Sequence, residues 1–255
     1  MIICVLDTET IGKVNQDLLN LGYKIVDIDM QDGQVKTLCQ RDYIVGKLFN
    51  NTVYMLNDDF VGYEKYAKYV NAIKEKTCIK RSLKQMLTTF KSDLQKYNVV
   101  FSYAYNNAFD LDKIKKACDN VGIECPINEK NCFDIWAYAL DFICRTDDYK
   151  NWALDNNQLT ASEVYISTTV ESVTRYLNGN IDFVEDHTAL SDTQHETKIL
   201  QEVVKRGCDI TRPLKASKFI ASDKVFTKKI KMPDGQIVDL KYKKTYERNG
   251  VITYK

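Results

Sequence analysis

The sequence MIICVLDTET (Met1–Thr10) places an apolar run directly before two acids. The run Ile2–Leu6 contains no polar residue, which is typical of a strand buried on both faces of a sheet. Asp7 and Glu9 follow it two residues apart, so in an extended chain their side chains point to the same face. Two such carboxylates repel each other unless a cation lies between them. An isolated pair also fits a solvated loop, because acidic side chains are mostly exposed.

Further strands and helices follow in an order that predicts an α/β fold. Strands are expected at Tyr23–Asp29 and Val35–Val45, joined by a hairpin whose turn contains Asp32-Gly33, and a fourth strand at Val99–Tyr105. Apolar residues at spacings of three and four predict helices within Val61–Tyr97, then from Ala108 to Asn120 and from Ser191 to Arg206.

Three segments give weaker or different patterns. The segment CFDIWAYALDFI (Cys132–Ile143) fits a strand or a helix. Thr160–Leu177 looks like a pair of helices, and Thr168 with Glu171 three residues later fits a capping box. Beyond Pro213, short alternating runs separated by turn residues predict a small β-hairpin or meander. The expected division is therefore a main domain over residues 1–212 and a β-rich extension over residues 213–255.

Length and composition agree with one sizeable core and exclude several classes of protein. With 255 residues and 44% hydrophobic content, the chain can bury one large core. Apolar runs are too short for a spanning helix, and the N-terminal run has no signal-peptide flanks, so a cytoplasmic protein without a membrane partner is expected. The eight cysteines form no CxxC pair, which argues against zinc and favours buried thiols.

A net charge of +1 hides an asymmetry along the chain. From Arg212 to Lys255 there are 12 Lys or Arg against 4 Asp or Glu, so the preceding residues are net acidic. The lysines of this extension, among them Lys228, Lys229 and Lys241, alternate with aromatic residues such as Phe226 and Tyr242. They could follow a phosphate backbone while the aromatic rings stack on bases, or they could simply keep an edge strand from aggregating.

Two further acids follow predicted structural elements at places where a ligand site is expected. Asp110 ends the segment YNNAFD after the fourth strand, and Asp192 stands at the start of the last helix. Ligand sites in open α/β sheets lie outside the carboxyl ends of strands, so these acids can converge with Asp7 and Glu9. Ligands that offer only oxygen favour Mg²⁺ or Mn²⁺, and a pair of such ions is the usual arrangement for displacement at phosphorus.

His187, five residues before Asp192, is the candidate proton acceptor. An imidazole titrates near neutral pH and can take a proton from water. A lone histidine is more often a surface or core residue. Its place just before the helix that carries Asp192 nevertheless favours a catalytic role.

Three blocks together resemble a known family of nucleases. LDTET with Asp7 and Glu9, YNNAFD with Asp110, and HTALSD with His187 and Asp192 resemble, in the right order, the three motifs of the DEDDh 3′–5′ exonucleases. That superfamily includes the proofreading subunit of bacterial replicative polymerases, ribonuclease T and oligoribonuclease. The resemblance covers about residues 1–210. It implies an RNase H-like fold, which is a mixed five-stranded sheet with its first three strands antiparallel, flanked by helices.

The resemblance also implies roles for individual residues. Two Mg²⁺ or Mn²⁺ ions would be bound by Asp7, Glu9, Asp110 and Asp192, with His187 as general base. Thr8 and Thr10 would contact the terminal nucleotide, Thr8 through its backbone because its side chain points away. Asn106 and Phe109 match the second motif, where the asparagine supports the site; Phe109 fits packing as well as substrate contact. Glu196, one turn after Asp192, is expected to be a surface or supporting acid.

The implied activity is removal of nucleoside 5′-monophosphates from the 3′ ends of single-stranded DNA, with a polymerase as a possible partner. Two alternatives stay open at this stage. An RNA-trimming exonuclease would share the terminal chemistry, since the distinction rests on 2′-hydroxyl contacts. A non-catalytic nucleic-acid-binding module would have no need for repelling carboxylates. The lysine-rich segment from Val45 to Lys96 is long for a compact member and predicts an inserted helix, and the residue composition favours a phage or bacterial source.

Overall fold

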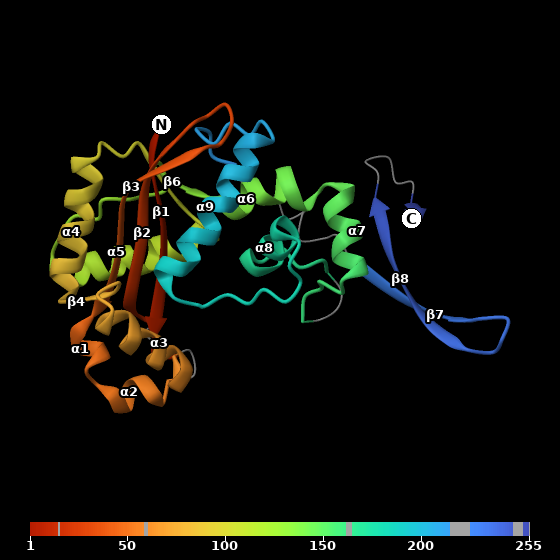
Figure 1. Ribbon diagram of the computed structural model, residues 1–255, viewed down its shortest axis with the longest axis horizontal. Helices are drawn as coiled ribbons and strands as arrows, with labels where there is room; N and C mark the ends of the chain where they lie inside the picture. Colours follow the sequence, from red (N-terminus) through yellow and green to blue (C-terminus); the bar gives the residue numbers. More distant parts are fainter. Residues whose placement is uncertain (15, 59–60, 162–164, 215–224, 247–251, 255) are drawn as a thin grey trace.

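The computed structural model describes residues 1–255 apart from 15, 59–60, 162–164, 215–224, 247–251 and 255. It is an α/β protein with a central sheet covered by helices on both faces, and a second, small sheet near the C-terminus (Figure 1). The predicted fold class is therefore confirmed.

The central sheet has the strand order β4-β3-β2-β1-β5-β6. Neighbours β1, β2 and β3 are antiparallel as predicted, whereas β5 runs parallel to β1, β6 parallel to β5, and β4 parallel to β3. The short edge strand β4 raises the expected five strands to six. The strands are β1 (Ile2–Ile11), β2 (Asp17–Ile28), β3 (Val35–Val45), β4 (Ile79–Arg81), β5 (Phe101–Ala104) and β6 (Cys132–Asp134).

Helices connect the strands and follow the last of them. The region Val61–Tyr97, in which helices were expected, contains α3 and α4 with β4 between them. The helices are α1 (Gly46–Phe49), α2 (Thr52–Leu56), α3 (Gly62–Lys74), α4 (Leu83–Lys96), α5 (Asn107–Val121), α6 (Ile135–Ala139), the π-helix η1 (Leu140–Cys144), α7 (Asp147–Asp155), α8 (Val170–Asn178) and α9 (Ala189–Lys205).

The apolar run at the start of β1 is buried on both faces, as its composition predicts. Ile3 and Val5 belong to the core cluster that contains the apolar side of α9, and Cys4 and Leu6 belong to the cluster beneath α4 and α5. Odd-numbered residues of β1 therefore face α9, and even-numbered residues face α5. This alternation decides where the acids that follow can point.

A third, smaller cluster lies at the end of β1 where the inserted helices pack. Ile11 and Leu19 of the sheet contact the apolar residues Met55 and Tyr69 of the insert there, all fully buried. The segment from α1 to α3 confirms the inserted helix predicted for the long linker, and it is part of the core.

The predicted helical pair at Thr160–Leu177 is wrong. Among the described residues of this segment α8 is the one helix, and Ile166 makes an isolated antiparallel bridge with Leu159. The N-cap of α8 is Thr169, whose side chain accepts a hydrogen bond from the backbone N–H of Ser172. Thr168 lies one residue before this cap, and its Oγ1 accepts a hydrogen bond from the Trp136 indole at 3.1 Å. Local sequence signals could not show this contact, since Trp136 is 32 residues away.

The C-terminal extension is β-rich, as predicted. It comprises β7 (Val225–Lys231), β8 (Ile237–Tyr246) and β9 (Ile252–Tyr254), all antiparallel, with Gly235 at φ +87° in the first turn. The side chains of Phe226 and Tyr242, proposed above to stack on bases, lie outside the described residues. All eight cysteines are free thiols and most are buried, in line with the sequence. Among the described residues, no helix is sufficiently long and apolar to cross a membrane.

Candidate metal centre

The carboxyl half of β1 is open on one side. β1 pairs with β5 only over Ile3–Val5, while its pairing with β2 continues to Ile11. Asp7 and Glu9 therefore lie within a strand and not on a loop beyond it. They project from the face that β1 turns toward α9, past the point where β5 ends.

Helix α9 is fixed against β2 by two residues of that strand. The side-chain oxygen of Asn20 accepts a hydrogen bond from the backbone N–H of Ala189 at 3.0 Å. At Gly22 the helix backbone approaches so closely that an added Cβ would lie 2.2 Å from the Leu190 nitrogen. These contacts place the first turn of α9, and with it Asp192, beside the acids of β1.

Three of the four predicted metal ligands converge. One carboxylate oxygen each from Asp7, Glu9 and Asp192 lie within 4.8 Å of one another. A hard cation with oxygen ligands fits such a group. The predicted convergence of residues from the first and last motifs is therefore present in the structure.

The fourth acid, Asp110 on α5, is joined to β1 through Thr8. Its Oδ1 accepts hydrogen bonds from the Thr8 backbone N–H at 2.9 Å and from Thr8 Oγ1 at 2.7 Å. The expectation that the Thr8 side chain points away from Asp7 and Glu9 is correct. The expectation that its backbone N–H is free for the substrate is wrong, because Asp110 uses it.

Burial and mutual repulsion raise the pKa values of the carboxyls at this centre. Burial is the largest cause for Asp7, whose pKa lies well above its ordinary value, followed by the charge of Asp110. Burial raises the pKa of Asp110 to about 7 against the opposing hydrogen bonds from Thr8. Burial, with the charges of Glu185 and Glu9, raises the pKa of Asp192 to about 8. A bound divalent cation would favour the ionised form of each carboxyl and so lower all of these pKa values.

Two buried carboxylate oxygens support this interpretation. Among the described residues, Asp192 Oδ1 and Glu196 Oε2 are buried and have no hydrogen-bond partner. Buried polar atoms almost always have a partner, so an unpaired one indicates a missing ion or water. The donor set at this centre therefore fits the hard divalent cation that the sequence implies.

Glu196 was expected to be a surface or supporting acid, and the surface assignment is wrong. It is 2% exposed, and its Oε1 accepts a hydrogen bond from the backbone N–H of Tyr105 at 3.3 Å. Its charge contributes to the raised pKa of Asp7 after burial and Asp110. The signal was present in the sequence, because a residue four positions after Asp192 lies on the same face of a helix.

A lysine that sequence analysis did not select also reaches the site. Lys65 of α3 forms an ion pair with Glu9, its Nζ 2.7 Å from Oε2. No motif marked Lys65, because the residue belongs to the inserted helices.

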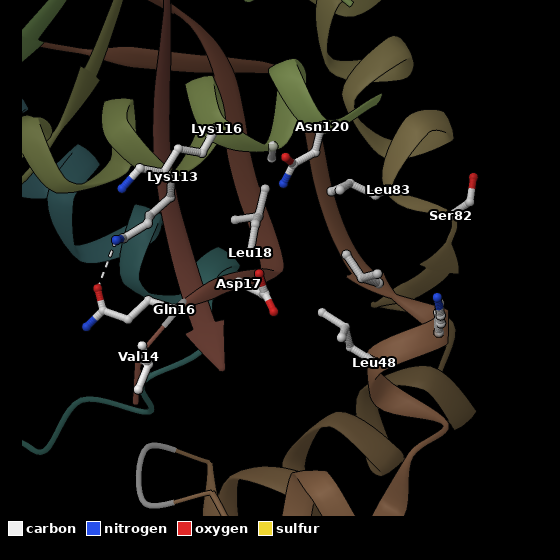
Figure 2. A pocket seen from close by; sticks show the side chains of 13 residues that line it. Val14, Gln16, Asp17, Leu18, Leu48, Ser82, Leu83, Lys113, Lys116 and Asn120 are labelled. Atoms are coloured by element: carbon white, nitrogen blue, oxygen red, sulfur yellow. Dashed lines mark hydrogen bonds between the residues drawn. The ribbon is translucent and has the colours of Figure 1, made fainter. Parts of the chain in front are cut away.

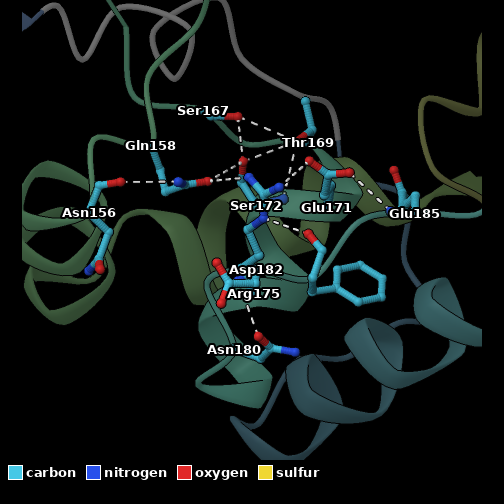
Figure 3. Close-up of polar contacts among 11 residues, drawn as sticks. Asn156, Gln158, Ser167, Thr169, Glu171, Ser172, Arg175, Asn180, Asp182 and Glu185 are labelled. Atoms are coloured by element: carbon cyan, nitrogen blue, oxygen red, sulfur yellow. Dashed lines mark hydrogen bonds and ion pairs between the residues drawn. The ribbon is translucent and has the colours of Figure 1, made fainter.

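His187 lies on the exposed loop before α9, with a left-handed backbone at φ +53°. After burial and Lys65, its charge is a further influence on the pKa of Glu9, and in the lowering direction. One ring nitrogen lies within 4.8 Å of carboxylate oxygens of Glu171 and Glu185. Figure 3 shows the polar network that holds these two acids: Glu171 pairs with Arg175 at 2.8 Å and accepts from the Glu185 backbone N–H at 3.0 Å.

The other residues predicted to contact the substrate differ in exposure: Thr10 is buried, whereas Asn106 and Phe109 are exposed. Thr10 is buried on β1, and Asn106 is exposed with φ +61°, its backbone N–H donating to Asp134 Oδ1 at 2.9 Å. Phe109 is 37% exposed, and the ammonium of Lys113 lies 5.0 Å from its ring centroid. The exposed ring leaves a face available for contact, whereas the bound backbone N–H of Asn106 indicates a local structural role.

A groove of about 710 Å³ lies beside Lys113, between α5 and the start of β2 (Figure 2). Lys113 donates a hydrogen bond to Gln16 at 2.8 Å on one side of it, at the left in Figure 2. Lys47 and Lys116 also line it, against a single acid, Asp17, among the lining residues. Its positive charge and apolar floor suit a polyanion with aromatic bases.

Comparisons with known proteins identify no family for this chain. No protein-family model matches the sequence, and no curated protein matches it significantly.

Proposed function

We propose that this chain is a metal-dependent 3′–5′ exonuclease that removes nucleoside 5′-monophosphates from single-stranded DNA. The observation that carries the proposal is the convergence of Asp7, Glu9 and Asp192 within 4.8 Å, from a strand and a helix far apart in sequence. A binding module gains nothing from burying repelling carboxylates, whereas a metal-dependent hydrolase requires them.

Each residue then has a defined task. Asp7, Glu9, Asp110 and Asp192 would hold two Mg²⁺ or Mn²⁺ ions, which supply Lewis-acid stabilisation of the charge developing on the phosphate and on the leaving 3′-oxygen. Thr8 orients Asp110 through its two hydrogen bonds. His187, exposed beside the site, accepts the proton of the attacking water.

The surroundings of the site favour single-stranded substrate. The exposed ring of Phe109 offers a stacking surface next to Asp110, and Lys113, whose ammonium lies 5.0 Å from that ring, also lines the groove with Lys47 and Lys116. Stacking on an aromatic face requires a base that is free of its partner strand. The nucleotides upstream of the 3′ end are proposed to occupy this groove.

The test is a cleavage assay on matched single-stranded DNA and RNA oligonucleotides labelled at the 5′ or the 3′ end, in Mg²⁺ and in EDTA. The proposal expects a ladder that shortens from the 3′ end, mononucleotide as the labelled product of 3′-labelled substrate, and no reaction in EDTA. DNA is expected to be degraded faster than RNA; the reverse would identify an RNA-trimming enzyme.

A non-catalytic module gives a different result in the same assay. It would bind the oligonucleotides without shortening them in either Mg²⁺ or Mn²⁺. The variant Asp7→Asn provides the control for contaminating nuclease, because its preparation should bind but not cleave.

A further inference from the structure

Lys65 is the only side chain from the inserted helices for which the described residues show an ion pair with one of the predicted metal ligands. Its Nζ lies 2.7 Å from Glu9 Oε2, and the two side chains are 11% and 19% exposed. Burial raises the pKa of Glu9, while the charge and the hydrogen bond of Lys65 oppose that rise. In the absence of metal, the ammonium group therefore supplies a positive charge at the acidic centre.

The position of Lys65 is imposed by the packing of α3. Tyr69, one turn later on the same helix, is fully buried and donates a hydrogen bond through its hydroxyl to Asn20 at 3.2 Å. Lys68, on the same side, donates to the backbone oxygen of Asp186 at 2.9 Å, next to His187. Helix α3 thus lies beside the end of β1 (Figure 1) and contacts both the strand and the loop of the site.

The same packing means that α3 does not depend on the ion pair for its position. Apolar residues of the insert, including Phe49, Met55 and Val61, are buried in a cluster with Ile11 and Ile44 of the sheet. A neutral residue at position 65 is therefore compatible with the fold.

Charge balance decides what Lys65 can do once the site is filled. A divalent cation bound by Glu9 would repel an ammonium group at hydrogen-bond distance from the same carboxylate. A phosphate bound to that cation would attract the ammonium group, because it returns negative charge to the site. Lys65, which is already paired with Glu9, is placed to respond to both the cation and the phosphate.

We propose that Lys65 is a displaceable cation: it binds Glu9 in the metal-free protein, releases Glu9 to a divalent cation, and then binds a phosphate oxygen of the terminal nucleotide. The inference rests on the proposed function, since it assigns Lys65 to the same centre. It makes α3 part of the active site and gives the inserted helices a role in coupling metal binding to phosphate binding.

The experiment measures Mn²⁺ binding to the full-length chain by calorimetry, and then binding of thymidine 5′-monophosphate at saturating Mn²⁺. Lys65→Met is expected to bind Mn²⁺ more tightly, by about fivefold or more, because no ion pair must be broken. The same variant is expected to bind the nucleotide about tenfold more weakly, since it lacks a charge-assisted hydrogen bond. Lys65→Arg should restore nucleotide binding.

Lys74→Met is the matched control, because Lys74 lies exposed in the last turn of the same helix. It should change neither affinity. Unchanged or weaker Mn²⁺ binding by Lys65→Met, or unchanged nucleotide binding, overturns the proposal. If the wild-type chain binds both ligands as expected but cleaves no oligonucleotide, the proposed function fails while this assignment stands; if it binds no Mn²⁺, both fail.

Discussion

In the sequence Thr8 looks like a spacer between two acids, but in the fold it donates two hydrogen bonds to Asp110. The spacing of Asp7 and Glu9 is enough to predict that they point together, because strand geometry is local. The two hydrogen bonds from Thr8 to Asp110 connect residues 102 positions apart. No local pattern reports such a contact. The identities of the acids could therefore be predicted from the sequence, but not the hydrogen bonds that orient them.

Asp7→Asn should abolish cleavage and stabilise the metal-free protein. The substitution removes one of several repelling carboxylates whose pKa values burial raises, so the free energy of unfolding in EDTA should rise by about 1–2 kcal/mol. Activity should fall by more than about 100-fold, and stabilisation by Mg²⁺ should be lost. Urea titrations with EDTA and with Mg²⁺ measure both stabilities.

Asp155→Asn, at an exposed position of α7, is the control and should resemble the wild type. An Asp7→Asn protein that keeps wild-type activity in Mg²⁺ would remove Asp7 from the site.

The stability of the metal-free protein should fall as pH rises from about 5 to about 8. Burial raises the pKa of Asp110 to about 7 and, with neighbouring charges, raises that of Asp192 to about 8. In the unfolded chain both groups lose their protons near pH 4. The folded state therefore binds more protons over this range, and each group lowers the free energy of unfolding by up to about 1.4 kcal/mol per pH unit, Asp110 until about pH 7 and Asp192 until about pH 8.

Urea midpoints at several pH values in EDTA measure this slope. Saturating Mg²⁺ should flatten it, because a bound cation favours the ionised carboxylates. A midpoint that stays constant or increases between pH 5 and 8 in EDTA would contradict the assigned burial of these acids.

At the scale of elements, α9 illustrates the limit of periodicity. Its apolar residues at spacings of three and four predict the helix, and the observed bounds, Ala189–Lys205, agree closely with the expected Ser191–Arg206. The docking of its first turn against Gly22 depends on close contact between two backbones. Periodicity identifies the face of a helix that is buried but not the strand that it contacts, so the position of Asp192 required the structure.

Gly22→Ala should disturb this docking. The new Cβ would lie 2.3 Å from the Ala189 carbonyl carbon, which is backbone and cannot rotate away. The free energy of unfolding should decrease by about 3 kcal/mol, and Mg²⁺ affinity should weaken because Asp192 moves with the helix. Denaturant unfolding and calorimetry measure the two effects.

Gly46→Ala is the matched control, because the nearest atom to its new Cβ would be 3.7 Å away. Its stability should stay within about 0.5 kcal/mol of the wild type. If the Gly22→Ala protein were as stable as this control, α9 would be able to move away from β2 without a loss of stability.

At the scale of the whole molecule, charge and structure divide the chain at nearly the same place. The basic segment begins at Arg212, and the backbone oxygens of Ile210 and Arg212 accept hydrogen bonds from the buried Tyr103 and Tyr138 hydroxyls at 2.8 Å each. Leu214 packs against the same core cluster. Contacts with the core of the main domain therefore extend to Leu214, and composition alone could not show these anchors.

Truncation after Leu214 should leave a folded domain with weaker affinity for nucleic acid. The extension carries exposed lysines, among them Lys228 and Lys229, whose loss should lower affinity about tenfold at low salt. The slope of log affinity against log salt should shrink by about 0.7 for each lysine that contacts a phosphate. Fluorescence anisotropy with a labelled single-stranded oligonucleotide at several salt concentrations measures both.

Turnover at saturating substrate should be unchanged, because the truncation leaves every predicted catalytic residue in place. Equal affinity and equal salt dependence in the truncated and full-length proteins would mean that the lysines serve only to keep the edge of the small sheet soluble.

The two glycines that contact α9 restrict how this protein can vary in length. Gly22 lies against Ala189 and Leu190 at the start of the helix, and Gly33, in the hairpin turn between β2 and β3, lies against Gln201 near its end. Strand β2 and the turn after it therefore fix the number of helical residues between Ala189 and Gln201. An inserted residue between these contacts would rotate the later half by about 100° and break one of them. Insertions should be tolerated in the exposed turn between β7 and β8 and rejected between Asp192 and Gln201, which a library of single-residue insertions would reveal.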